Sequence, residues 1–183
     1  MSAPLVRPYI TYEDLCRMAP PESRWELFDG EAYMSPSPNR RHQELSMRLA
    51  LAFAGARGQG DQVFCAPLDV VLSPGTVHQP DLILVLEKKR AILKDVIRGS
   101  PDLVVEILSP THTERDRVMK METYARHGVG EYWIVDDEAR RVEIYRLDRE
   151  AGAYRLAETC APGDTARTPL LPLLAVDVKD LFE

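Results

Sequence analysis

The sequence is poor in cysteine. Only three cysteines occur among its 183 residues, and they lie far apart, are odd in number and form no C-x-x-C pair. Such a set indicates neither a disulfide framework nor a zinc cluster. We therefore expect Cys16, Cys65 and Cys160 to be reduced residues of the protein core.

Long apolar runs and an excess of basic charge are also missing. No stretch approaches the roughly 20 apolar residues that a membrane-spanning helix needs, and the first residues lack the basic and apolar segments of a signal peptide. Lys and Arg number 23 against 29 Asp and Glu, so the formal net charge is −6. Because phosphate affinity comes from Lys and Arg, a general basic nucleic-acid binder is excluded. We expect a cytoplasmic protein, without a membrane segment, whose nucleic-acid site would be local.

The residues that are present favour one compact α/β domain spanning residues 1–183. The composition, 45% hydrophobic, is sufficient for a substantial core. Short apolar runs bounded by Pro, Gly and Ser indicate strands, and spacings of three and four indicate helices packed on a mixed central sheet. We expect helices near 11–19, 45–56, 112–127 and 178–182, strands near 24–28, 31–35, 63–67, 68–72, 81–86, 103–108, 131–135, 140–147 and 154–160, a mixed connection at 88–98, and a Pro- and Leu-rich tail.

Two apolar segments each place a carboxylate beside a predicted central strand. Asp81 follows Pro80 at the start of the run 82–86, and Glu106 lies near the end of the run 103–108. If these strands are antiparallel neighbours, both carboxylates fall at the same end of the sheet. Mg²⁺ takes such hard oxygen ligands, and two adjacent carboxylates need a cation unless one of them protonates. The pair therefore predicts a divalent-metal site.

Asp102 competes with Asp81 for this role. Four residues along a strand separate Asp102 from Glu106 by about 13 Å, which is too far for two ligands of one ion. Asp81 is thus the better candidate. The structural alternatives are a salt bridge for Glu106 and a turn after Pro80 for Asp81. An unpaired carboxylate inside an apolar strand is costly, however, and functional sites are where such costs are tolerated.

The predicted helix after Glu106 adds a cation. Asp116, Lys120 and Tyr124 step by four, so they project from one helical face. An ammonium beside a reacting phosphate can stabilise the charge that develops there. The alternative is an exposed ion pair between Asp116 and Lys120, worth only tenths of a kcal/mol.

A local basic cluster marks the start of the helix near 45–56. Arg40, Arg41 and His42 lie at its N-terminal end, where backbone N–H groups also favour phosphate. This cluster predicts a phosphate contact. For His42 the alternatives are a residue that supports the metal ligands and an ordinary surface histidine. Nothing in the sequence indicates how bases would be read.

The chain as a whole resembles the Uma-type family of restriction-endonuclease-like proteins, which are members of the PD-(D/E)XK nuclease superfamily. The resemblance implies a restriction-endonuclease-like α/β fold, a Mg²⁺ or Mn²⁺ site and hydrolysis of DNA phosphodiester bonds. Related nucleases often pair to cut two strands, so it also implies a homodimer. The matching segments occur in order along the chain: Trp25 to Glu31, His42, Pro80-Asp81, Asp102 to Pro110, Asp116, Lys120, Tyr124 and Glu131 to Val135.

The resemblance also assigns roles, with one departure from the superfamily pattern. It implies that Asp81, Glu106 and the Ile107 carbonyl hold the metal. The lysine of the (D/E)XK motif is replaced by Leu108, and the Uma-type pattern places a lysine on the following helix, so Lys120 resembles a spatial substitute. Glu26 matches an acidic position that can support a metal, or it is only a hairpin carboxylate.

The leading hypothesis is therefore a metal-dependent endonuclease in which Asp81, Glu106 and Lys120 are catalytic. The second is a binding or regulatory protein that keeps the nuclease fold with little or no activity, favoured by the lost lysine and the acidic charge. The third is a small-ligand enzyme that uses the same carboxylates, for which the sequence offers no nucleotide loop, nucleophile elbow or cofactor motif.

Overall fold

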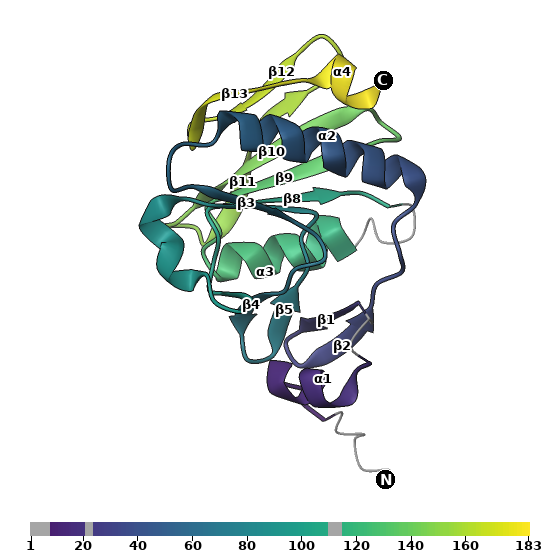
Figure 1. Cartoon of the computed structure of the whole chain (residues 1–183), viewed down its shortest axis with the longest axis vertical. Helices are drawn as coiled ribbons and strands as arrows, with labels where there is room; N and C mark the ends of the chain where they lie inside the picture. The colour runs from purple at the N-terminus through teal and green to yellow at the C-terminus, as the bar shows by residue number, and fades with distance from the viewer. Residues whose placement is uncertain (1–7, 21–23, 110–114) are drawn as a thin grey trace.

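A six-stranded mixed sheet forms the centre of the protein (Figure 1). The computed structural model describes residues 8–20, 24–109 and 115–183. The strand order is β11 (Ala153–Cys160), β10 (Arg141–Asp148), β9 (Glu131–Asp136), β8 (Leu103–Ile107), β6 (Leu82–Val85) and β3 (Gln62–Cys65). Strands β8 and β9 are parallel, and all other neighbours in this sheet are antiparallel.

Helix α2 (Arg40–Ala56) covers one face of this sheet (Figure 1). Asn39 caps it by accepting a hydrogen bond from the His42 N–H at 2.9 Å. Leu45, Leu49 and Phe53, spaced by four, are fully buried in the main core. That core also takes in alternate residues of β6, β8 and β9 and the C-terminal elements β12 (Thr165–Thr168), β13 (Leu171–Asp177) and α4 (Val178–Phe182).

The opposite face carries the helical segment that follows β8. It consists of a π-helical stretch, η2 (Arg115–Lys120), continued by α3 (Met121–Arg126). Val104, Tyr124 and Tyr132 pack together there. Because strand residues alternate between faces, Val104 and Glu106 point to this side while their neighbours point to α2. Glu106 is thereby directed toward η2 and α3.

A smaller five-stranded sheet lies beside the central one. Hairpin β1–β2 turns at Asp29 and Gly30, which both have positive φ, and glycine adopts this conformation without strain. Helix α1 (Tyr12–Met18) begins at a capping box between Thr11 and Asp14. The strand order is β2 (Glu31–Met34), β1 (Trp25–Phe28), β5 (Thr76–His78), β4 (Val70–Ser73) and β7 (Ile97–Arg98).

The predicted fold class, a mixed sheet flanked by helices, is confirmed, but several elements differ. The predicted strand 68–72 is β4 of the smaller sheet, and the strand predicted at 63–67 is the edge strand β3. The connection 88–98 contains the end of a 3-10 helix, η1 (Glu87–Ile92), and strand β7. Strands this short carry no readable period. The first residues of the predicted helix 112–127 lie outside the described ranges.

The tail and the cysteines also depart from expectation. The Pro- and Leu-rich tail forms the β12–β13 ladder, where Pro172 is tolerated because β13 pairs on one side only. Cys160 is buried as predicted, whereas Cys16 and Cys65 are exposed, so their assignment to the core was wrong. In the part of the chain that the structure describes, no helix is both long and apolar enough to cross a membrane.

Candidate functional site

Asp81 and Glu106 meet at the end of two adjacent strands. In the antiparallel pair β6–β8, Leu82 is opposite Val105, so the preceding Asp81 falls opposite Glu106. Both side chains are buried. Asp102 lies at the other end of β8, where it accepts a hydrogen bond from the Leu86 N–H at 2.9 Å. The strand-length argument that separated it from Glu106 is therefore correct.

Two groups hold the Asp81 carboxylate. Its Oδ2 accepts a hydrogen bond from the Ile107 N–H at 2.7 Å and lies 3.1 Å from Nε2 of His42, at the start of α2. The sequence left three roles open for His42, namely a phosphate contact, support of the metal ligands and an ordinary surface histidine, and its contact with Asp81 agrees with the second. His42 and Asp81 lie far apart along the chain, so no local spacing predicts their contact.

The Glu106 carboxylate is bound by the helical segment on its own side of the sheet. Tyr124 donates its hydroxyl to Oε1 at 2.8 Å, and the Lys120 ammonium lies 3.0 Å from Oε2. Lys120 is also 3.4 Å from Oδ1 of Asp116. The step of four predicted this shared face, although one part of it is π-helical. Lys120 is only 5% exposed, so the alternative of an exposed ion pair is wrong.

Glu26 of β1 brings the smaller sheet into the site. Its Oε1 lies 3.1 Å from the Lys120 ammonium and accepts the Gln79 N–H at 3.1 Å, while Oε2 accepts the Ser35 hydroxyl at 3.1 Å. Glu26 is therefore more than a hairpin carboxylate. Gln79 and Ser35 were not among the predicted residues. The only sequence signal was that Gln79 directly precedes Pro80-Asp81.

The site has more carboxylates than cations. Burial raises the pKa of Glu106 well above its usual range, and the charges of Asp116, Asp81 and Glu26 act in the same direction against Lys120. Burial and neighbouring charges also raise the pKa of Asp116. Burial alone would raise the pKa of Glu26, but Lys120 and other partners lower it to about 2. Although burial disfavours the ammonium, the carboxylates raise the pKa of Lys120 well above its usual range.

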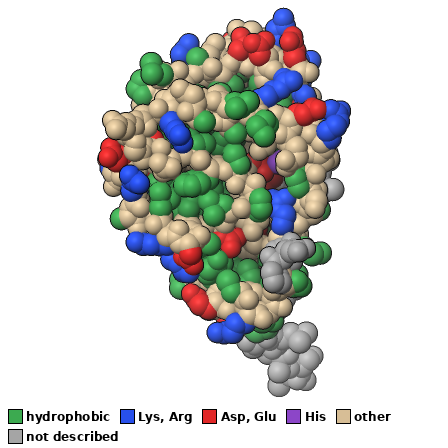
Figure 2. Space-filling view, viewed as in Figure 1, with side chains coloured by type: hydrophobic (Ala, Val, Ile, Leu, Met, Phe, Trp, Pro, Cys, Tyr) green, Lys and Arg blue, Asp and Glu red, His purple; other side chains and the backbone are tan. Residues whose placement is uncertain are grey.

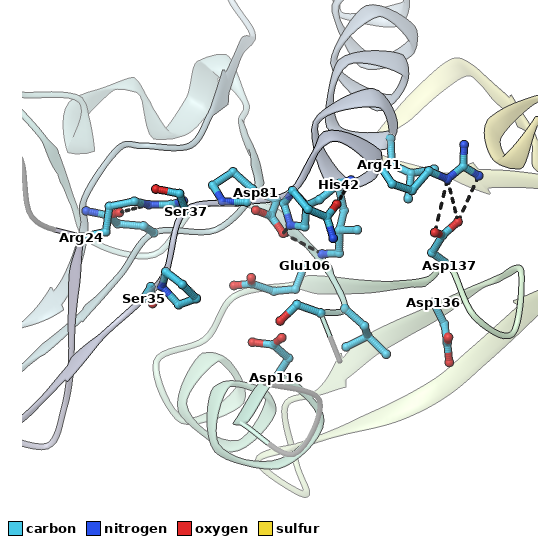
Figure 3. A pocket seen from close by; sticks show the side chains of 18 of the residues that line it. Arg24, Ser35, Ser37, Arg41, His42, Asp81, Glu106, Asp116, Asp136 and Asp137 are labelled. Carbon is cyan, nitrogen blue, oxygen red and sulfur yellow. Dashed lines mark hydrogen bonds and ion pairs between the residues drawn. The ribbon is translucent and has the colours of Figure 1, made fainter. Parts of the chain in front are cut away.

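These residues lie at a pocket of about 660 Å³ (Figure 3). Asp81, Glu106 and Asp116 occupy its centre in Figure 3, Arg24 and Ser37 lie on one side, and Arg41 and Asp137 on the other.

The predicted phosphate contacts are placed unequally around this pocket. Arg41 and His42 line it, but Arg41 is held by Asp137 at 3.0 Å and by the Phe182 carbonyl at 2.7 Å. The Arg40 side chain is 82% exposed, pairs with Glu44 and is not among the lining residues. A phosphate contact by any of the three stays a prediction.

Comparison with known protein families identifies the family of this chain. The model of a family described as "Uma2: Putative restriction endonuclease" matches residues 11–179. The chain belongs to the Uma2 family. The predicted resemblance is thereby confirmed, because the match spans almost all of the chain, including both strands and the helical segment of the site.

Two further similarities accompany the Uma2 match. A solved structure described as "a putative nuclease belonging to DUF820" from Anabaena variabilis has a TM-score of 0.76 at 19% identity, covering 94% of this chain and 97% of the other. At this identity the likeness establishes a shared fold. A Synechocystis protein named "Uncharacterized protein slr1290" is 25% identical over 140 residues, which make up 75% of this chain and 70% of that protein.

The donors of this Uma2 site fit a divalent cation. Oδ1 of Asp81 has no hydrogen-bond or ion-pair partner among the described residues, and three further carboxylates share the one Lys120 ammonium. Mg²⁺ needs only one or two carboxylates because it retains several waters. Within the described ranges, no group of three or more His, Cys, Asp or Glu side chains could hold a metal ion by itself. A divalent cation at this site would therefore need backbone oxygen and water as ligands in addition to the side chains.

His78 gives this Uma2 protein a predictable response to acid. Its ring is fully buried between Phe28 and Tyr124, and neither ring nitrogen has a hydrogen-bond partner among the described residues. Burial lowers its pKa from 6.5 to about 3. The Glu26 carboxylate, 3.8 Å from Nδ1, opposes this shift, and Lys120 acts in the same direction as burial. Between these pH values the unfolded chain binds the proton and the folded chain does not. The stability associated with neutral His78 is thus present above pH 6.5 and is lost as the pH falls toward 3.

The variant His78→Phe should be less sensitive to acid. Below pH 6.5, the slope of unfolding free energy against pH should be smaller than in the wild type by about 1 kcal/mol per pH unit. Urea unfolding at a series of pH values measures both slopes. Equal slopes would mean that His78 is not the group that takes up the proton.

Proposed function

We propose that this Uma2 protein is an endonuclease that uses Mg²⁺ or Mn²⁺ to hydrolyse phosphodiester bonds of DNA. The observation that carries the proposal is the meeting of Asp81 and Glu106 at adjacent strand ends, with the Lys120 ammonium 3.0 Å from Glu106, beside an open pocket. The description of the family, and that of the structural neighbour as a putative nuclease, support nucleic acid as the substrate.

Asp81, Glu106 and the Ile107 carbonyl are the groups that would hold the cation. When bound, it would act as a Lewis acid on the phosphate and favour deprotonation of the attacking water. The Ile107 N–H and His42 fix the orientation of Asp81. The Tyr124 hydroxyl does the same for Glu106, so that both carboxylates are positioned before substrate arrives.

Lys120 would stabilise the charge that develops on the phosphate. Its ammonium is buried and held by Glu106, Glu26 and Asp116, so little reorganisation is needed during the reaction. Because these carboxylates raise the pKa of Lys120, the ammonium stays charged and acts as an electrostatic group rather than a base. Glu26 and Asp116 are thus positioning residues for Lys120.

A second candidate function is nucleic-acid binding or regulation without efficient cleavage. One observation favours it: both Glu106 oxygens already accept hydrogen bonds, from Tyr124 and Lys120. A cation would have to share Glu106 with the ammonium. The formal net charge of −6 also disfavours broad contact with a polyanion, and in Figure 2 the Lys and Arg side chains are scattered over the face rather than gathered in one patch.

Plasmid cleavage tests the leading proposal. We expect the wild-type protein to nick or linearise supercoiled plasmid in Mg²⁺ or Mn²⁺ and to lose this activity on chelation, with recovery when the metal is restored. Gel electrophoresis of the plasmid forms measures the outcome. Cleavage that persists at full rate in chelator would contradict a metal-dependent mechanism.

Thermal unfolding separates the two candidate functions. Mg²⁺ at about 100 times its Kd should add about 2.7 kcal/mol to the stability, which raises the Tm by about 5–10 °C for a chain of this length. A clear rise in Tm without plasmid cleavage would favour the binding protein. Absence of both responses would count against the metal site itself.

A further inference from the structure

Arg24 differs from the other cations that line the pocket. Lys120 is surrounded by carboxylates, and Arg41 lies 3.0 Å from Asp137. Among the described residues, no carboxylate lies within ion-pair distance of Arg24. Its side chain makes one hydrogen bond within the described part of the chain, a long one of 3.4 Å from Nε to Oε1 of Gln79. The two terminal nitrogen atoms of the guanidinium have no partner among the described residues, so they can bind a ligand.

The contact with Gln79 connects Arg24 to the candidate site. The Gln79 N–H donates to Glu26, and its side-chain amide donates to Asp69 at 2.8 Å. Gln79 is thus held at two points besides Arg24, so Arg24 contacts a fixed neighbour. A guanidinium supported in this way loses less freedom when it binds than a fully exposed one.

The two sides of the pocket differ in their charged side chains. In Figure 3, Arg24 lies with Ser37 on one side of the carboxylates, whereas Asp136 and Asp137 lie on the other. Asp136, Asp137 and Glu138 form an acidic turn, partly neutralised by Arg41, Arg117 and Arg141. The Arg24 side is lined by a guanidinium that has no carboxylate partner among the described residues and by the hydroxyl groups of Ser35 and Ser37, and its one described carboxylate, Glu26, is paired with Lys120. A polyanion is attracted to that side and repelled by the acidic turn.

We propose that Arg24 binds a backbone phosphate of the substrate strand, and that this phosphate is a neighbour of the one to be cleaved. The strand then approaches the carboxylates past Arg24 and Ser37, and not across the 136–138 turn. A planar guanidinium can donate two parallel hydrogen bonds to one phosphate, which fixes the position of the strand without reading its sequence. This inference rests on the proposed function, because it takes the substrate to be a polynucleotide.

The test compares Arg24→Gln and Arg24→Lys with the wild type, and Arg57→Gln is the matched control. Arg57 directly follows the C-terminal end of α2, is exposed, and does not line the pocket. Binding of a short fluorescein-labelled DNA duplex is measured by anisotropy in Ca²⁺ at several salt concentrations. Arg24→Gln should weaken binding by about tenfold to a hundredfold and reduce the salt slope by about one ion. Arg24→Lys should keep the slope but recover only part of the affinity.

Duplexes in which one phosphate is replaced by an uncharged analogue can locate the phosphate that Arg24 contacts. A series of duplexes, each with a single methylphosphonate, should show one position beside the cleavage point where the wild type loses affinity and Arg24→Gln loses no more. Unchanged thermal unfolding of both Arg24 variants would exclude a folding defect. If an Arg24 variant has a lower Tm, the methylphosphonate series with wild-type protein still identifies the single phosphate on the Arg24 side whose neutralisation weakens binding.

The outcomes separate this inference from the proposed function. Weaker DNA binding by Arg24→Gln, with no cleavage by any form, would support the phosphate contact and reject the endonuclease. Cleavage by the wild type with equal DNA binding and equal salt slope in Arg24→Gln and Arg57→Gln would reject the contact alone. If the wild type binds no DNA, both are rejected.

Discussion

The variant Lys120→Met is expected to lower the unfolding free energy at neutral pH by about 3–5 kcal/mol in metal-free buffer. Methionine has a similar length, but it leaves Glu106, Glu26 and Asp116 as three buried carboxylates without their shared cation. Urea unfolding measures the loss. Cleavage by the variant should fall by at least about a hundredfold, because the charge near the phosphate is removed.

Two comparisons show whether electrostatics causes this loss. Lys94 is exposed, so Lys94→Met removes the same charge from the surface and should change stability by less than about 0.5 kcal/mol. The double variant Lys120→Met with Glu26→Gln should lose less unfolding free energy than the sum of the losses in the two single variants, because it has one uncompensated charge fewer than Lys120→Met. If Lys120→Met is as stable as the wild type, the ammonium is not a structural counter-ion.

The variant Asp81→Asn is expected to lose cleavage by at least about a hundredfold and to lose the rise of Tm with Mg²⁺. Asparagine keeps an oxygen that can accept the hydrogen bond from the Ile107 N–H, so the fold should be retained. What disappears is the negative charge opposite Glu106. Plasmid cleavage and thermal unfolding with and without Mg²⁺ measure the two effects.

Asp102 supplies a matched control for this variant. Like Asp81, it follows a proline, is buried and adjoins a central strand, but it lies at the opposite end of β8. Asp102→Asn should cleave at the wild-type rate per folded molecule and keep its response to Mg²⁺. If both variants lose the response equally, the effect of Asp81→Asn reflects general destabilisation rather than a lost ligand.

Part of the candidate site could be predicted because its signals are local. Apolar runs identify β6 and β8, and one run begins after a carboxylate while the other has a carboxylate near its end. The strand rise alone separates Asp102 from Glu106. The step of four that places Lys120 and Tyr124 on one face is equally local. These patterns depend on neighbouring residues only.

The remaining residues of the site could not be predicted because their contacts are long-range. Glu26 reaches Lys120 from another sheet, and His42 reaches Asp81 from the start of α2. Arg24 carries no motif, and its distinction is the lack of a carboxylate among its described neighbours, which only the packed chain can reveal. For the same reason the short strands β5 and β7 escaped prediction, since pairing and not periodicity defines them.

The sequence by itself determined that Asp81 and Glu106 accompany strands, that Lys120 follows on a helix, and that the chain resembles Uma-type proteins. Only the tertiary structure decided that one buried ammonium serves three carboxylates and that the two sides of the pocket differ in charge. The physical reason is that hydrophobic periodicity depends on residues that are close together in the sequence. Charge balance, in contrast, depends on which distant side chains burial brings within a few ångströms of one another.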